Sequence, residues 1–188
     1  MKKIFLLMVA LCSVCLFSCE EYSRKQQIKK IIHTWMDKQV QIPDNYQCNI
    51  SGKDTTSVAC TELLQRSYKV LLYTDSTGCL DCKFKVFSWK QLIHEADSLF
   101  PNQVGFLFFI QPKDKKELQH ILKWDRMDYA VFIDENNTIN QRNHFSDQLP
   151  YQCFLLDGKN TVIGIGNPAS NPDIWALYKR QIRGEKIK

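Results

Sequence analysis

The sequence predicts an α/β fold with a mixed central sheet, helices on both faces of that sheet and an additional N-terminal helix. After Ser67, short apolar runs alternate with longer segments of helical periodicity. The run Val104–Ile110 is apolar at nearly every position, so we expect a central strand that is buried on both faces. Two cysteines, Cys79 and Cys82, lie where an expected strand gives way to an expected helix.

The alternation sets the expected order of the sheet and its helices. The strands are expected over residues 69–74, 104–110, 129–134, 153–156 and 161–165, and the helices over residues 79–100, 114–125 and 172–182. Asp114 is a plausible N-cap, and Pro172 suits the first turn of the last helix. The turn Asp-Gly-Lys-Asn over residues 157–160 joins the last two strands as a hairpin.

A further hairpin is expected ahead of this alternation. Strands over residues 46–50 and 55–59 flank the turn residues Ser-Gly-Lys-Asp. Cys48 and Cys60 fall on the two arms, but they are not placed symmetrically about the turn. The asymmetry favours two separate buried thiols, and a cross-strand disulfide is the alternative.

The N-terminus has the pattern of an export signal. Lys2 and Lys3 precede an uncharged, mostly apolar stretch over residues 4–17, which is short for a membrane span. The tetrapeptide Leu-Phe-Ser-Cys that ends at Cys19 resembles the lipobox of bacterial lipoproteins. This resemblance implies that residues 1–18 are a lipoprotein signal peptide and that Cys19 carries the lipid. We therefore expect an exported, membrane-anchored protein, held at the outer membrane and facing the periplasm.

Residues 19–42 are expected to be a lipid-anchored tether that contains an amphipathic helix. Apolar side chains recur there at spacings of three and four residues, at Ile28, Ile31, Ile32, Trp35 and Met36. A stripe of this kind most often packs on a core, so we expect the helix to cover the domain; binding to a partner is the alternative. Pro43 breaks the pattern and begins a domain that is expected to extend over residues 43–188.

Composition limits the partners. The formal net charge is +5, and loss of Lys2 and Lys3 with the leader would lower it to +3. Basic residues are interleaved with acidic ones, so we expect no nucleic-acid partner. Disulfides persist in an oxidising envelope, so each cysteine after Cys19 is a candidate for a redox or structural role. The number of these cysteines is odd, so at least one is expected to stay outside any disulfide within the chain.

The segment Cys79-Leu80-Asp81-Cys82 predicts dithiol chemistry. This spacing at a helix start places both sulfurs on one turn, where they can form and exchange a disulfide. The positive end of the helix dipole favours a thiolate at Cys79, which would attack, and Cys82 would resolve the mixed disulfide. Asp81 adds a negative charge there, which should raise the pKa of Cys79 relative to a neutral dipeptide. We therefore expect a reductant rather than a strong oxidant.

The element order, with Cys-x-x-Cys after the first long strand, resembles the thioredoxin fold. Within that fold it resembles the TlpA/ResA-like group of membrane-tethered, envelope-facing thiol-disulfide oxidoreductases, over residues 43–182. The resemblance is carried by Pro43-Asp44, by Gly52-Lys53, by residues 131–137 and by residues 154–157. It implies an enzyme that reduces or exchanges protein disulfides through Cys79 and Cys82 without a cofactor. It also implies a cis-proline opposite the motif, for which Pro150 is the candidate.

The chain departs from this group at several positions. Gly78 stands where relatives usually carry a tryptophan, and Tyr73 falls where thioredoxin carries a buried acid. An ungapped alignment of the strand over residues 153–156 puts Tyr151 at the cis-proline position. These departures motivate the alternative that the protein is a non-catalytic thioredoxin-fold lipoprotein that binds a partner protein or peptide, so its status as an enzyme is open.

Two further side chains, His144 and Cys153, are expected near the motif. A metal site at the two thiolates would need histidines, and only His144 precedes the loop that faces the motif; we expect no metal. Cys153 lies on an expected central strand. A small core residue is the expected role for it, and a third redox thiol is the alternative.

Overall fold

The protein is described here by a computed structural model, which covers residues 22–44, 46–55, 58–77 and 84–185. The chain divides into two compact units, Met1–Trp35 and Met36–Lys188. In the first unit, residues 22–35 form a helix, so the N-terminal helix is confirmed. The expected signal peptide and Cys19 lie outside the described residues. Within the covered ranges, no helix is long and apolar enough to cross a membrane.

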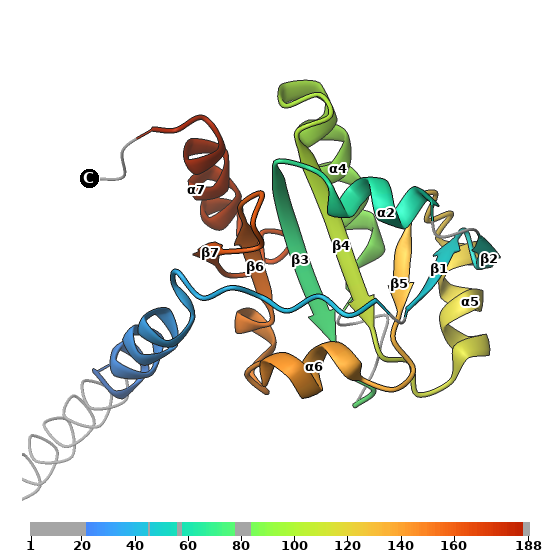
Figure 1. The fold of residues 1–188 in the computed structure, drawn as a ribbon, viewed down its shortest axis with the longest axis horizontal. Helices are drawn as coiled ribbons and strands as arrows, with labels where there is room; N and C mark the ends of the chain where they lie inside the picture. Colours follow the sequence, from blue (N-terminus) through green and yellow to red (C-terminus); the bar gives the residue numbers. More distant parts are fainter. Residues whose placement is uncertain (1–21, 45, 56–57, 78–83, 186–188) are drawn as a thin grey trace, which may run out of the picture. The chain divides into compact units, whose positions relative to one another are not determined.

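The second unit is built on a mixed sheet whose described part has seven strands in the order β2-β1-β5-β4-β3-β6-β7 (Figure 1). The strands are β1 (Gln47–Ile50), β2 (Lys53–Thr55), β3 (Tyr68–Thr74), β4 (Val104–Ile110), β5 (Val131–Ile133), β6 (Cys153–Leu156) and β7 (Val162–Ile165). The central strands β3, β4 and β5 run parallel, and β1 and β6 pair antiparallel on either side of them. The expected mixed sheet is confirmed.

Helices cover both faces of this sheet. The described helices are α2 (Val58–Leu64), α4 (Val86–Leu99), α5 (Lys115–Trp124), α6 (Thr138–Asn143) and α7 (Pro172–Ile182), with a short 3-10 helix, η1 (Leu149–Tyr151). Figure 1 shows α2 and α6 in front of the sheet and α4 behind it. Buried side chains of α4, α5 and α7 share one core with alternate residues of the central strands. Two faces that are each covered by helices require strands that are apolar on both sides.

Strand β4 is the centre of the sheet, as its sequence predicts. All of its residues are buried, and it pairs with β3 along its whole length, from Val104 opposite Tyr68 to Ile110 opposite Thr74. Gly105 allows the end of α2 to approach, because an added Cβ would lie 2.6 Å from the carbonyl oxygen of Leu63. Parallel pairing in this register brings the ends of β3 and β4 to the same edge of the sheet, where the Cys-x-x-Cys segment follows β3.

The second unit begins before Pro43. Gln39 forms a β-bridge with Thr161, and the Val40 amide donates to the carbonyl oxygen of Asn160 at 2.9 Å. The Gln41 amide donates to Oδ1 of the buried Asn143 on α6, also at 2.9 Å. These bonds hold the segment that enters the domain against the β7 edge of the sheet and against α6.

Candidate functional site

The candidate site follows β3, at the carboxyl edge of the parallel strands. Residues 78–83 contain the catalytic candidates Cys79 and Cys82 and lie outside the described residues. The chain enters this segment through Asp75, whose carboxylate accepts hydrogen bonds from the amide and the hydroxyl of Thr77 at 2.9 and 2.6 Å. This turn directs the chain away from β3 just before the motif.

The chain leaves the motif segment through a side chain fixed in the core. Phe84 is fully buried, and its ring lies edge-on to Phe108 of β4 at a centroid distance of 5.1 Å. Lys85 adopts the left-handed conformation, with φ of 46°, and α4 begins only at Val86. The expectation of one helix over residues 79–100 is therefore wrong at Lys85. The break has a packing reason: Phe84 and Val86 would face opposite sides of a continuous helix, and here both are buried.

Gln152 lies beside the end of β3 and was not identified from the sequence. Its carbonyl oxygen accepts from the Tyr73 amide at 2.9 Å, and its side-chain amide donates to the Ser146 carbonyl oxygen at 2.9 Å. The side chain is 1 % exposed, and its Oε1 has no hydrogen-bond partner among the described residues. Its position directly before the strand that begins at Cys153 was the signal that could have found it.

Tyr73, opposite Gln152 at the end of β3, is buried at the same edge of the sheet. Its hydroxyl donates to Oδ1 of Asn137 at 2.8 Å, and its ring lies 5.2 Å from that of Phe145. Burial, followed by the nearby charge of Asp75, raises the pKa of Tyr73 to about 12. Tyr73 therefore stays protonated at neutral pH and cannot act there as a base.

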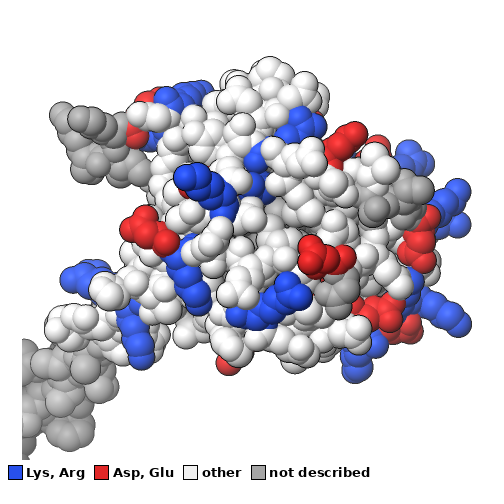
Figure 2. Space-filling model, viewed as in Figure 1, with Lys and Arg blue, Asp and Glu red and all other residues white. Residues whose placement is uncertain are grey.

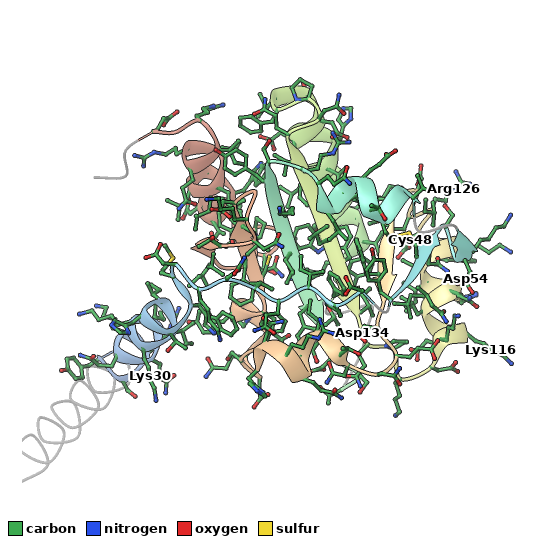
Figure 3. All side chains as sticks on the ribbon, in the orientation of Figure 1. Lys30, Cys48, Asp54, Lys116, Arg126 and Asp134 are labelled. Carbon is green, nitrogen blue, oxygen red and sulfur yellow. A yellow bond between two sulfur atoms is a disulfide. The ribbon has the colours of Figure 1, made fainter. Side chains whose placement is uncertain are left out.

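Asp134 holds the neighbouring helix in place (Figure 3). Its buried carboxylate accepts from the amides of Thr138 and Ile139 at 2.9 and 2.8 Å, at the start of α6. These bonds satisfy amides that have no partner within the helix. They fix the helix start next to Asn137, the partner of Tyr73.

The structure does not contain the expected cis-proline. Pro150 is an exposed residue of η1, and the described backbone contains no cis peptide bond. Directly before β6, which pairs antiparallel with β3, it is Gln152 whose backbone accepts a hydrogen bond from β3. Pro150 and Tyr151 belong to the 3-10 helix that precedes it. The prediction at Pro150 relied on the position of one proline, whereas the local hydrogen bonds form a helical turn.

Cys153 is a core residue, as expected. It lies on β6 opposite Leu72 of β3, is fully buried and is not part of a disulfide. Burial raises the pKa of its thiol well above the usual range. Cys153 therefore carries no thiolate at neutral pH, which argues against a third redox thiol.

Cys48 and Cys60 form a disulfide, with their Cα atoms 6.1 Å apart (Figure 3). The expectation of two separate buried thiols is therefore wrong. The second arm of the hairpin ends at Thr55, and Cys60 lies on α2, not on a strand. The positions of the two cysteines about the hairpin turn therefore do not predict whether they pair, because Cys60 is brought to Cys48 by α2 and not by a strand of the hairpin. Both cysteines are buried.

The described residues show mixed charge on one face of the molecule (Figure 2) and no metal cluster. Figure 2 shows basic and acidic residues interspersed over one face of the molecule. Within the described ranges, no group of three or more His, Cys, Asp and Glu side chains is placed to hold a metal ion. His144 is exposed and ends α6 in the left-handed conformation.

No family model and no curated protein matches the chain. Solved structures do match. One is a peroxidoxin from Mycobacterium tuberculosis, with a TM-score of 0.55 and 13 % identity, covering 81 % of this chain and 99 % of that one. Another is a thiol-disulfide oxidoreductase from Bacteroides fragilis NCTC 9343, with a TM-score of 0.52 and 16 % identity, covering 74 % of this chain and 99 % of that one. A thioredoxin-like protein in its oxidised form also matches, with a TM-score of 0.52 and 11 % identity, covering 79 % of this chain and 98 % of that one. At these identities the likeness shows the fold alone. The class is therefore a thioredoxin-like α/β fold, as the sequence predicts.

Proposed function

We propose that this protein is a thiol-disulfide oxidoreductase whose reacting groups are Cys79 and Cys82. One observation carries the proposal: Cys-x-x-Cys occupies the link between β3 and α4 of a thioredoxin-like sheet, with Thr77 before it and the buried Phe84 after it. Fold alone does not confer function, so the argument rests on these two thiols at this position.

The proposed reaction is two successive thiol-disulfide exchanges. The Cys79 thiolate attacks one sulfur of a substrate disulfide, forming a mixed disulfide and releasing the other substrate sulfur as a thiolate that takes up a proton. The Cys82 thiolate then attacks the Cys79 sulfur and releases the second substrate thiolate. The substrate gains two electrons, and the protein is left with a Cys79–Cys82 disulfide. A dithiol donor in the envelope would reduce it again.

Reduction of protein disulfides is the proposed direction. Asp81 lies between the two cysteines in sequence and disfavours a second negative charge on Cys79, whereas strong oxidants depend on a stabilised thiolate. We expect the measured reduction potential of the Cys79–Cys82 pair to lie near that of thioredoxin, at about −270 mV. A potential near about −120 mV, typical of a dedicated oxidase, would contradict this direction.

The proposed location is the cell envelope, with a lipid on Cys19 as the membrane anchor. The export pattern of residues 1–18 supports this proposal. The buried Cys48–Cys60 disulfide supports it independently, because structural disulfides persist in oxidising compartments and are rare in a reducing cytosol.

A trapping experiment tests the redox function. Cys82→Ala removes the resolving thiol, so mixed disulfides should accumulate in the envelope through Cys79 and disappear on reduction. Cys79→Ala/Cys82→Ala is the matched control and should trap nothing. The purified wild-type domain should reduce insulin, and the double variant should not.

The opposite result would favour the non-catalytic alternative. If Cys82→Ala forms no mixed disulfides and the wild-type domain leaves insulin oxidised, the oxidoreductase proposal fails. Gly78 and the absence of a cis-proline among the described residues would then fit a thioredoxin-fold module that binds a partner protein or peptide.

A further inference from the structure

The helix over residues 22–35 carries a charge pattern that the proposed thiol chemistry does not use. Its cationic side chains are Arg24, Lys25, Lys29 and Lys30, and it has no acidic side chain. Elsewhere in the chain, basic and acidic residues are interleaved. A helix with charge of one sign complements a surface of the opposite sign.

The same helix has an apolar face. At about 100° per residue, Ile28, Ile31 and Ile32 occupy an arc of about 100°. Lys25 and Lys29 follow at the edge of this arc. Ile32 is 45 % exposed and Ile28 and Ile31 are half-buried, so all three side chains keep some surface open to solvent. Trp35, at the end of the helix, falls within the same arc, but it is buried and so is not available to a partner surface.

We infer that this helix binds the surface of a bilayer that contains anionic phospholipid. Its isoleucines would enter the boundary between headgroups and acyl chains, and its lysines would lie at the level of the lipid phosphates. A basic helix with an apolar stripe is suited to such a surface, and each cation near an anionic leaflet strengthens binding several-fold. A lipid on Cys19 would bring the helix to the same surface, but the inference does not depend on it.

A vesicle-flotation experiment tests this inference. The chain from Glu20 onward is used, so that neither residues 1–18 nor an acyl chain can bind lipid. We expect it to float with vesicles in which about three in ten lipids are phosphatidylglycerol and the rest phosphatidylcholine, and not with pure phosphatidylcholine. Binding should fall as salt is raised.

Matched variants separate the helix from the rest of the chain. Lys29→Glu/Lys30→Glu should weaken binding at least tenfold, and Ile28→Ser/Ile32→Ser should weaken it even at low salt. Lys113→Glu/Lys116→Glu makes the same change in net charge at exposed lysines of the second unit and should change binding less than about twofold. Circular dichroism checks that each variant is folded.

The inference is overturned if the chain does not float with anionic vesicles at low salt. It is also overturned if the two charge-reversal variants lose binding equally, because net charge rather than the helix would then be responsible. Insulin reduction should be unchanged in both charge variants, so failure here is distinct from failure of the proposed oxidoreductase function.

Discussion

Tyr73 shows how one residue changes the chemistry available at the edge of a sheet. It is 2 % exposed and bonded to Asn137, six positions before Cys79. With its pKa raised to about 12, it neither takes up nor releases a proton at neutral pH. Under the proposed function, the proton that Cys82 loses must therefore pass to a group other than Tyr73.

Tyr73→Phe should change how stability depends on pH. The folded pKa of Tyr73, about 12, lies above its usual value of 10.0, so between these two values the unfolded chain loses the proton first. The contribution of Tyr73 is therefore complete below about pH 10 and falls as pH rises toward 12. The free energy of unfolding of the wild type should fall between about pH 8 and pH 11, and in the variant this fall should be smaller by roughly 1 kcal/mol, as measured by urea unfolding.

Two further results complete this prediction. At pH 8 the variant should lose about 1 kcal/mol, because the Asn137 oxygen loses the hydroxyl donor. Tyr129 has its pKa raised to about 12, mainly by burial, and it is present in both proteins, so its effect cancels. Identical pH slopes in the two proteins would show that Tyr73 is not held protonated by the fold.

At the scale of elements, the Cys48–Cys60 bridge connects β1 to α2. The residues between them include the hairpin turn and β2, so the bridge closes a short loop of chain on one side of the sheet. A crosslink of this kind stabilises the folded state mainly by restricting the unfolded chain.

Cys48→Ala/Cys60→Ala should lower the free energy of unfolding by about 3 kcal/mol, the chain-entropy estimate for a loop of this length. Urea denaturation measures the loss, and the wild type in dithiothreitol should lose a similar amount. Insulin reduction should persist in the folded variant. Loss of that activity without loss of folding would instead place this disulfide in the path of the electrons.

Secondary structure could be predicted where it depends on local pattern. Val104–Ile110, Cys153–Leu156 and Pro172–Ile182 have the bounds that the sequence predicts. The break at Lys85 could not be predicted, because helical periodicity continues on both sides of it. What places the break is the space for Phe84 beneath β4, which does not exist until the sheet has formed.

At the scale of the whole molecule, a helix precedes a domain whose described residues form their own core. Residues 37–41 are hydrogen-bonded within that domain, so the helix is followed directly by fixed chain. At 1.5 Å per residue, the helix over residues 22–35 spans roughly 21 Å.

Cys19→Ser tests the anchor. The wild type should incorporate labelled palmitate and stay with membranes through a high-salt wash. The variant should incorporate none and be released by that wash, because the basic helix alone binds through screened charges. Release of the wild type under the same conditions would show that no lipid anchor is present.

The sequence by itself determined the alternation of strands and helices, the central position of Val104–Ile110 and the place of Cys79 and Cys82 between a strand and a helix. These features depend on periodicity and neighbouring residues, which the sequence displays directly. Only the tertiary structure decided that Cys60 reaches Cys48, that Gln152 meets Tyr73 and that α4 begins after Lys85. Each of these depends on distances between segments that are brought together when the sheet and its helices pack.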